Sequence, residues 1–124
     1  MLLKREFSFD AAHRLERYHG KCENLHGHTY RMSVEIEGSP DAEGMIVDFA
    51  RVKETVDREV VSKLDHSYLN DTVRQPSAEN IARFVFERLE PFLKGPNYSL
   101  SAVQVWETPR SSVIFRRADM ENRK

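Results

Sequence analysis

The sequence predicts an α+β domain in which a four-stranded antiparallel sheet carries two helices on one face. Three observations lead to this fold class. Apolar and polar residues alternate near both ends of the chain, as in half-buried strands, whereas in the middle apolar residues recur every three or four positions, as in helices. Turn residues separate these segments in the order ββααββ. A length of 124 residues fits one domain.

The first two predicted strands lie near the N-terminus. The first runs from Leu3 to His13, where the odd positions carry Leu3, Phe7, Phe9, Ala11 and His13, interrupted by Arg5. The second alternates without interruption from His28 to Glu37 and ends at a Gly-Ser-Pro-Asp turn. We expect the polar segment between them, 16–24, to be a loop.

Two amphipathic helices are predicted in the middle of the chain. The buried stripe of the first consists of Phe49, Val52, Val56 and Val60. The second begins after Pro76 with Ser77 as its N-cap. Its stripe consists of Ile81, Val85, Leu89 and Phe92, and a Lys-Gly-Pro-Asn sequence ends it.

The chain returns to strands in its last third. We expect one strand over residues 100–108, a turn at 109–111 and a short strand over 113–115. One domain then covers residues 1–118, and 119–124 form a charged tail. Two helices cover only one face of a sheet, so we expect assembly into an oligomer to cover the other.

Composition excludes several classes of function. Nineteen basic residues against 20 acidic ones give a formal charge of -1, which does not favour a nucleic-acid binder. The single cysteine cannot form an internal disulfide, which argues against a secreted, disulfide-stabilised protein. No segment approaches a membrane span of about 20 apolar residues, and the N-terminus does not resemble a signal peptide. We therefore expect a cytosolic location without membrane partners.

Three histidines form the strongest candidate site. His26 and His28 are two positions apart, so their side chains project from the same strand face. Alone, such a pair can simply be solvated at a strand end. His13 ends the neighbouring strand on its apolar face, however, and can meet the pair. Three imidazoles without a carboxylate or thiolate suit Zn²⁺ with one open, catalytic position.

Cys22 lies four residues before His26 in a polar segment. It can be a small buried apolar residue, a metal ligand, or a thiolate whose pKa is lowered beside a cation. As a thiolate it would serve as a nucleophile or base. The spacing leaves these alternatives open.

Two further positions carry candidate functional groups. His66 follows Asp65, which can orient its ring through a turn, although an exposed loop pair is the simpler interpretation. Glu107 shares a strand face with Val103 and Val105. Its carboxylate can either lie in water at the strand end or accept two hydrogen bonds from a guanidine-like ligand edge.

Sequence blocks across nearly the whole chain resemble the 6-pyruvoyl-tetrahydropterin synthase family, including its 6-carboxy-tetrahydropterin synthase branch. The blocks, in the family's order and spacing, are residues 7–13, 22–28, 44–49, Leu64-Asp65-His66 with Leu69-Asn70, Ser77-Ala78-Glu79-Asn80 and Glu107-Thr108. The resemblance implies a tunnelling fold (T-fold). In this fold the sheets of three subunits join into a barrel, two trimers stack into a hexamer, and the active sites lie between subunits.

The resemblance also implies roles for individual residues. His13, His26 and His28 would be the zinc ligands, and Cys22, Asp65 and His66 the proton-transfer set. Glu107, with Thr108, would hold the amino-pyrimidine edge of a pterin, which Ser77 and Ala78 would contact mainly through their backbone. The implied substrate is 7,8-dihydroneopterin triphosphate. In the carboxy branch its side chain is cleaved to acetaldehyde and triphosphate on the route to queuosine.

One departure from the family pattern keeps other activities open. Glu23 follows Cys22 directly, and some family members use a glutamate in this stretch to form 6-hydroxymethyl-dihydropterin, a folate precursor. Glu23 is thus an alternative base or a solvent-facing loop residue. The 6-pyruvoyl product, a nucleotide cyclohydrolase of the same fold and a non-catalytic zinc- or pterin-binding protein are the remaining alternatives.

Overall fold

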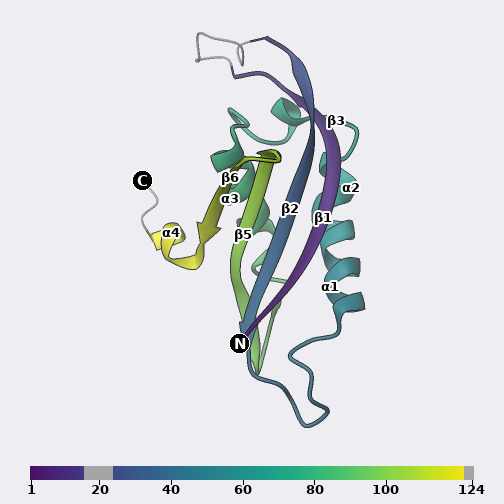
Figure 1. The fold of residues 1–124 in the computed structure, drawn as a ribbon, viewed down its shortest axis with the longest axis vertical. Coiled ribbons are helices and arrows are strands. Elements are labelled where there is room, and N and C mark those ends of the chain that lie inside the picture. The colour runs from purple at the N-terminus through teal and green to yellow at the C-terminus, as the bar shows by residue number, and fades with distance from the viewer. Residues whose placement is uncertain (16–23, 122–124) are drawn as a thin grey trace.

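The computed structural model describes residues 1–15 and 24–121 and contains the predicted antiparallel sheet (Figure 1). Its four main strands are β1 (Leu2–His13), β2 (His26–Gly38), β5 (Tyr98–Thr108) and β6 (Ser111–Arg116). Each pairs antiparallel with the next in the order β1-β2-β5-β6. Two short strands extend the sheet: β3 (Ser67–Tyr68) pairs parallel with β1, and β4 (Lys94–Gly95) pairs antiparallel with β5.

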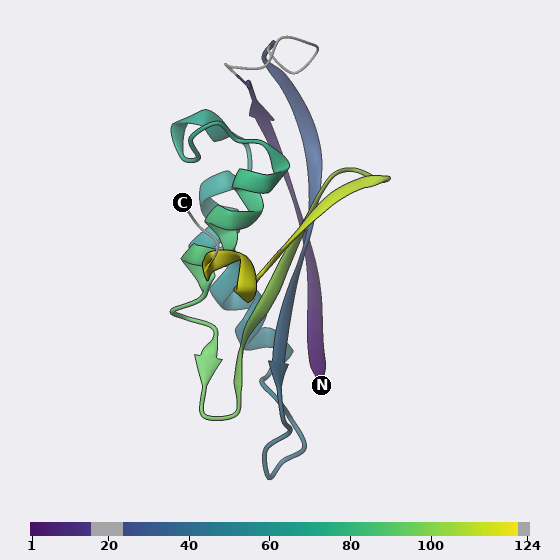
Figure 2. The ribbon, with the colours of Figure 1, turned by 90° about the vertical axis from the view of Figure 1, so that its left-hand side faces the viewer.

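The helices lie on one side of the sheet, as Figure 2 shows with the sheet seen from its edge. They are α1 (Phe49–Val56), the π-helical segment η2 (Asp57–Val61), α2 (Ser62–Leu64), the 3-10 helix η3 (Leu69–Asp71), α3 (Ala78–Leu89) and α4 (Arg117–Glu121). The opposite sheet face is mostly polar, although Leu2 on β1 and Ile114 on β6 are exposed apolar residues. Along β1 it presents the exposed side chains of Lys4, Glu6, Ser8 and Asp10. The predicted two-helix layer and its α+β class are therefore confirmed.

The apolar face of the first helix stays buried from Val52 to Leu64 because the helix changes from α-helical to π-helical geometry partway along. Val52, Val56, Val60 and Leu64 are all fully buried. Successive steps of four residues in an α-helix drift by about 40° around the axis. The π-helical segment η2 has a wider turn, which brings the later members of the stripe back towards the sheet.

The predicted stripes are wrong at two end positions. Phe49 is 56% exposed and Phe92 is 45% exposed. Phe49 is the first residue of α1, and Phe92 lies beyond the end of α3, which stops at Leu89. Phe49 lies where the chain enters α1, and Phe92 lies in the turn between α3 and β4, so the apolar spacing continues past the buried face of each helix.

Side-chain caps define where both long helices begin. The Ser77 hydroxyl accepts a hydrogen bond from Asn80 N at 3.2 Å, which confirms Ser77 as an N-cap. Asp48 caps α1 in the same way, since its Oδ1 accepts from Ala50 N at 2.8 Å. At the other end of the chain, residues 119–121 of the predicted tail belong to α4. Within residues 1–15 and 24–121, no helix combines the length and apolar character needed to cross a membrane.

We predict that Asp48→Ala lowers the free energy of unfolding by about 1 kcal/mol, because the first turn of α1 loses its capping acceptor. Urea denaturation at fixed protein concentration measures the change. Asp48→Ser keeps an acceptor and should retain most of the stability. Equal midpoints for Asp48→Ala and the unaltered protein would contradict the role of the cap.

Candidate functional site

The three predicted histidines meet at one end of the β1–β2 hairpin. The strand register places His13 opposite His26, and Ala11 opposite His28. The three imidazole ring centres are 4.6 to 5.1 Å apart, and the His13 ring is completely buried. The convergence inferred from strand parity is thus present.

Backbone carbonyls fix the orientation of two of these rings. His13 Nδ1 lies 2.7 Å from the carbonyl oxygen of Pro76, and His26 Nδ1 lies 2.7 Å from that of Asn24. A carbonyl only accepts, so each Nδ1 carries the proton and donates it. Each Nε2 is then left with a lone pair.

The two Nε2 atoms of His13 and His26 are only 3.0 Å apart. Two lone pairs at this distance repel each other unless a positive charge, a proton or a metal ion, lies between them. Metal-binding histidines commonly show this pattern, in which one ring nitrogen donates to a carbonyl and the other faces the ion. The donor arrangement therefore fits a metal ion.

His28 completes the group as a neutral imidazole. Burial lowers the pKa of His28 below its ordinary value; the Glu107 carboxylate acts in the opposite direction, and the other two histidines lower the pKa further. Its Nε2 is buried and has no hydrogen-bond partner, although Glu107 Oε1 lies 3.0 Å away. The two atoms are close but not aligned for a hydrogen bond, which leaves this nitrogen available as a ligand.

Glu107 lies among the histidines. Its Oε1 is 3.5 Å from His13 Nε2, and ligand atoms of all four residues lie within 4.8 Å of one another. Three imidazoles and one carboxylate can hold a metal ion. Glu107 lies on the core-facing row of β5, as its parity with Val103 and Val105 predicts. The pairing of β5 with β2, which the sequence pattern does not show, brings this row beside His28.

Asp65 and His66 form a second cluster beside β1. Asp65 Oδ2 lies 3.0 Å from His66 Nδ1, and Asp65 Oδ1 accepts from Asp10 N at 2.9 Å. The Asp10 N–H holds the pKa of the Asp65 carboxyl below its ordinary value, with the His66 side chain contributing in the same direction. Although adjacent in sequence, the two side chains meet because His66 has a φ of 56°.

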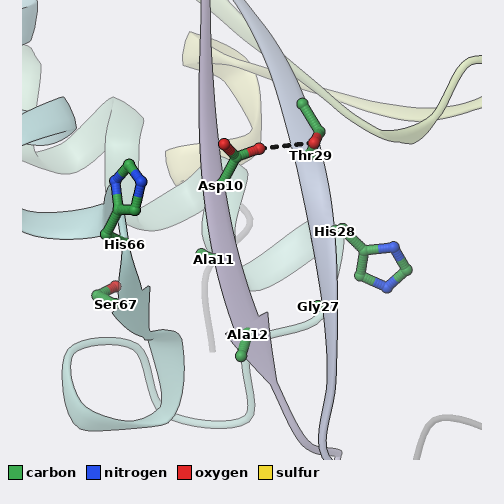
Figure 3. Close-up of a pocket in the computed structure, with 8 residues that line it drawn as sticks. All are labelled: Asp10, Ala11, Ala12, Gly27, His28, Thr29, His66 and Ser67. Atoms are coloured by element: carbon green, nitrogen blue, oxygen red, sulfur yellow. Dashed lines mark hydrogen bonds between the residues drawn. The ribbon is translucent and has the colours of Figure 1, made fainter.

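The two clusters point away from each other. Figure 3 shows the His66 ring beside β1 and the His28 ring beyond β2, with both strands between them. An open hollow of about 600 Å³ on this end of the sheet is lined by Asp10, Ala11, Ala12, Gly27, His28, Thr29, His66 and Ser67. The His66 and His28 rings thus lie on opposite sides of the β1–β2 pair, although both residues line this hollow.

The remaining predicted site residues are placed as follows. Ser77 uses its hydroxyl as the N-cap of α3, Ala78 is buried, and Thr108 ends β5 beside the turn to β6. Pro76, which directly precedes Ser77, carries the carbonyl that binds His13. This contact places the 77–78 backbone next to the histidine group. Cys22 and Glu23 lie outside the described residues.

Sequence reasoning missed three groups that support the histidines. The carbonyls of Asn24 and Pro76 are backbone groups, which no side-chain pattern reveals. The Tyr30 hydroxyl lies 3.2 Å from His13 Nδ1. Tyr30 lies two residues after His28 and so on the same strand face, which is the one sequence signal that could have identified this contact.

Comparison with known proteins agrees with this fold. A solved structure of Caenorhabditis elegans 6-pyruvoyl tetrahydropterin synthase matches with a TM-score of 0.84 and 30% identity over 94% of each chain. The Haemophilus influenzae 6-carboxy-5,6,7,8-tetrahydropterin synthase is 35% identical, covering 88% of this chain and 94% of that protein. A Pyrococcus furiosus dihydroneopterin monophosphate aldolase is 40% identical, covering 81% and 83%.

The fold and its structural neighbours define a protein of the T-fold class. More specifically, the chain belongs to the 6-pyruvoyl tetrahydropterin synthase family, whose model matches residues 2–118. The resemblance inferred from the sequence blocks is confirmed. The family is one of enzymes, and the relatives named tetrahydropterin synthases connect this chain with pterin chemistry.

We predict that His28→Ala abolishes stoichiometric zinc in elemental analysis of the purified protein, because the group loses one of its three imidazoles. His66→Ala is the matched control, since it removes an imidazole outside the group and should leave the zinc content unchanged. Full zinc content in His28→Ala would exclude the three-histidine site.

Proposed function

We propose that the chain is a zinc-dependent lyase that converts 7,8-dihydroneopterin triphosphate and one water molecule to 6-carboxy-5,6,7,8-tetrahydropterin, acetaldehyde and triphosphate, on the route to queuosine. The main support is the pair of Nε2 atoms of His13 and His26, which lie 3.0 Å apart with their lone pairs towards each other. The names of the relatives from Haemophilus influenzae and Synechocystis, at 35% and 37% identity, support the carboxy product.

His13, His26 and His28 would hold the zinc ion in this proposal. When bound, zinc supplies Lewis-acid polarisation of the substrate's side-chain oxygens. The carbonyls of Pro76 and Asn24 keep two of the imidazoles in the tautomer that binds metal. The lowered pKa of His28 keeps the third imidazole neutral at neutral pH, because its proton is lost below the ordinary histidine range.

Proton transfer is assigned to the other predicted residues. The Cys22 thiolate takes a proton from the substrate side chain, and the His66 ring gives or takes its counterpart. Asp65 would orient that ring, since it receives the Asp10 N–H on one oxygen and lies against His66 with the other. The lowered pKa of Asp65 keeps its carboxylate ionised and able to accept a hydrogen bond from His66 Nδ1.

Glu107 would hold the amino-pyrimidine edge of the pterin. Its carboxylate can accept two parallel N–H donors, and its side chain is 26% exposed, so a ligand can reach it. In this role it leaves His28 Nε2 to the metal, and three imidazoles then keep one position open for substrate. Thr108 and the backbone at Ser77 and Ala78 would complete the pterin pocket.

We further propose a hexamer of two stacked trimers with active sites between subunits. Three observations support this assembly. The sheet has one face free of helices, and in the described part of the chain the outer edge of β1 pairs with another strand only at Ala11 and Ala12. The third is that the His66 and His28 rings lie on opposite sides of β1 and β2 within one chain, so a neighbouring copy would offer a His66 ring from a different direction.

A second candidate activity is formation of 6-hydroxymethyl-dihydropterin for folate. Two observations favour it: the adjacent Cys22 and Glu23 supply two candidate bases, and the Pyrococcus furiosus relative is named an aldolase acting on dihydroneopterin monophosphate. Product analysis distinguishes both of these activities from formation of the 6-pyruvoyl product and from a non-catalytic pterin-binding role.

We predict that the purified protein releases acetaldehyde from 7,8-dihydroneopterin triphosphate and forms a pterin with the mass of the 6-carboxy product. Cys22→Ala should lower turnover by roughly two to four orders of magnitude, because general acid–base groups contribute about that much. Coupled detection of acetaldehyde and mass spectrometry of the pterin measure both.

Glu23→Ala is the control for the assigned base and should keep most of the turnover. Normal activity in Cys22→Ala with loss in Glu23→Ala would instead support the folate-directed activity. No turnover of any dihydroneopterin phosphate in zinc-loaded protein would contradict an enzymatic role.

We also predict complementation between two inactive variants, His28→Ala and His66→Ala. If the histidine group comes from one subunit and His66 from its neighbour, random mixing of equal amounts restores both in about a quarter of the sites. Activity is measured after joint refolding of the two proteins. Separately refolded and then mixed samples are the control. No recovery after joint refolding would place the whole site within one subunit.

A further inference from the structure

The ring of His13 depends on a backbone segment far from it in sequence. His13 Nδ1 donates to Pro76 O at 2.7 Å, and the ring is completely buried. Pro76 precedes α3, 63 residues further along the chain. The orientation of the His13 ring, and with it of Nε2, therefore depends on the groups that hold the Pro76 carbonyl and residues 75–77 in place.

This segment contains a strained residue. Gln75 has a φ of 47°, in the left-handed region that residues with side chains rarely adopt. It also precedes Pro76, and a residue before proline favours an extended conformation. Such strain persists only where the surrounding structure enforces it, and it is concentrated at ligand sites.

Asn80 holds the strained residue. Its side-chain Nδ2 donates to Gln75 O at 2.8 Å, and Ser77 N donates to the same oxygen at 2.8 Å. Asn80 is itself fixed in the first turn of α3, because its backbone N–H donates to the Ser77 hydroxyl. The amide of Asn80 thus connects the start of a rigid helix to the peptide that precedes Pro76.

We propose that Asn80 is a positioning residue for the metal centre. By holding Gln75 O it fixes the peptide on which Pro76 O depends, and this oxygen keeps the His13 ring in the metal-binding tautomer. His13 Nε2 then faces His26 Nε2 at 3.0 Å. Asn80 contacts neither the histidines nor the substrate in this role. The inference rests on the proposed metal site.

Asn97 offers a matched control, because it makes the same kind of contact elsewhere. Its Nδ2 donates to Ser39 O at 2.8 Å and to Ile46 O at 2.9 Å, beyond the Gly38 end of β2. The histidines lie at the opposite, His26 end of that strand. Loss of Asn97 should therefore destabilise the fold without reaching the metal group.

The test is a titration of the metal-free, full-length protein with Co²⁺, followed by its visible absorption and by competition with a chelator. Asn80→Ala should bind Co²⁺ about tenfold more weakly than the unaltered protein, with a changed absorption band, because a support of a ligand histidine is lost. Asn97→Ala should keep the affinity and the spectrum, although its thermal midpoint in excess chelator falls.

Asn80→Asp provides a second variant that preserves the helix. A carboxylate near a helix N-terminus is favourable, but it cannot donate to Gln75 O. It should show the same weakened Co²⁺ binding with little loss of thermal stability. Wild-type affinity and spectrum in either Asn80 variant would overturn this inference alone. Failure of the unaltered protein to bind Co²⁺ would overturn the metal site and this inference together.

Discussion

The candidate site depends on one constraint, the opposition of two imidazole lone pairs. His13 and His26 each donate their Nδ1 proton to a backbone carbonyl, which leaves their Nε2 atoms facing each other at 3.0 Å. The β1–β2 register places the rings opposite each other, and the segments before α3 and β2 supply the carbonyls. A bound metal ion would replace this repulsion with coordination, because both rings are already in the form that coordinates it.

Much of the fold could be predicted because its elements are locally encoded. Strand alternation and the Ser77 cap depend on neighbouring residues, and the convergence of His13 with His26 follows from one hairpin. The sequence predictions failed where contacts between segments far apart in the chain determine whether a residue is buried or which residues it meets. Spacing could not show that Phe49 and Phe92 lie beyond the buried surface. Likewise, only the pairing of β2 with β5 brings Glu107 to the histidines, and nothing in a residue pattern reveals a backbone carbonyl.

The helix-free face of the sheet and the positions of His66 and His28 on opposite sides of β1 and β2 both favour the proposed oligomer. Along β1 the exposed side chains of this face are polar from Lys4 to Asp10, so this part of the face can lie in water. The His66 ring and the His28 ring nevertheless lie on different sides of β1 and β2. In the proposed assembly, a neighbouring copy would bring its Asp65–His66 pair to the histidine group. This would link catalysis to assembly in a way that no single-chain contact provides.

Backbone strain gives a physical reason why the two halves of the site are well defined. The non-glycine residues with positive φ in the described chain are His66 and Gln75, and each adjoins one half. His66 N donates to Asp10 O, while Gln75 O accepts from Asn80 and Ser77. Each strained residue is thus fixed to a regular element, β1 or α3, rather than to a loop. Rigid elements transmit position better than loops do, so the strain costs stability but fixes where the His66 ring and the Pro76 carbonyl lie. The hydrogen bonds that fix these two strained residues therefore also fix the positions of the neighbouring groups of the candidate site.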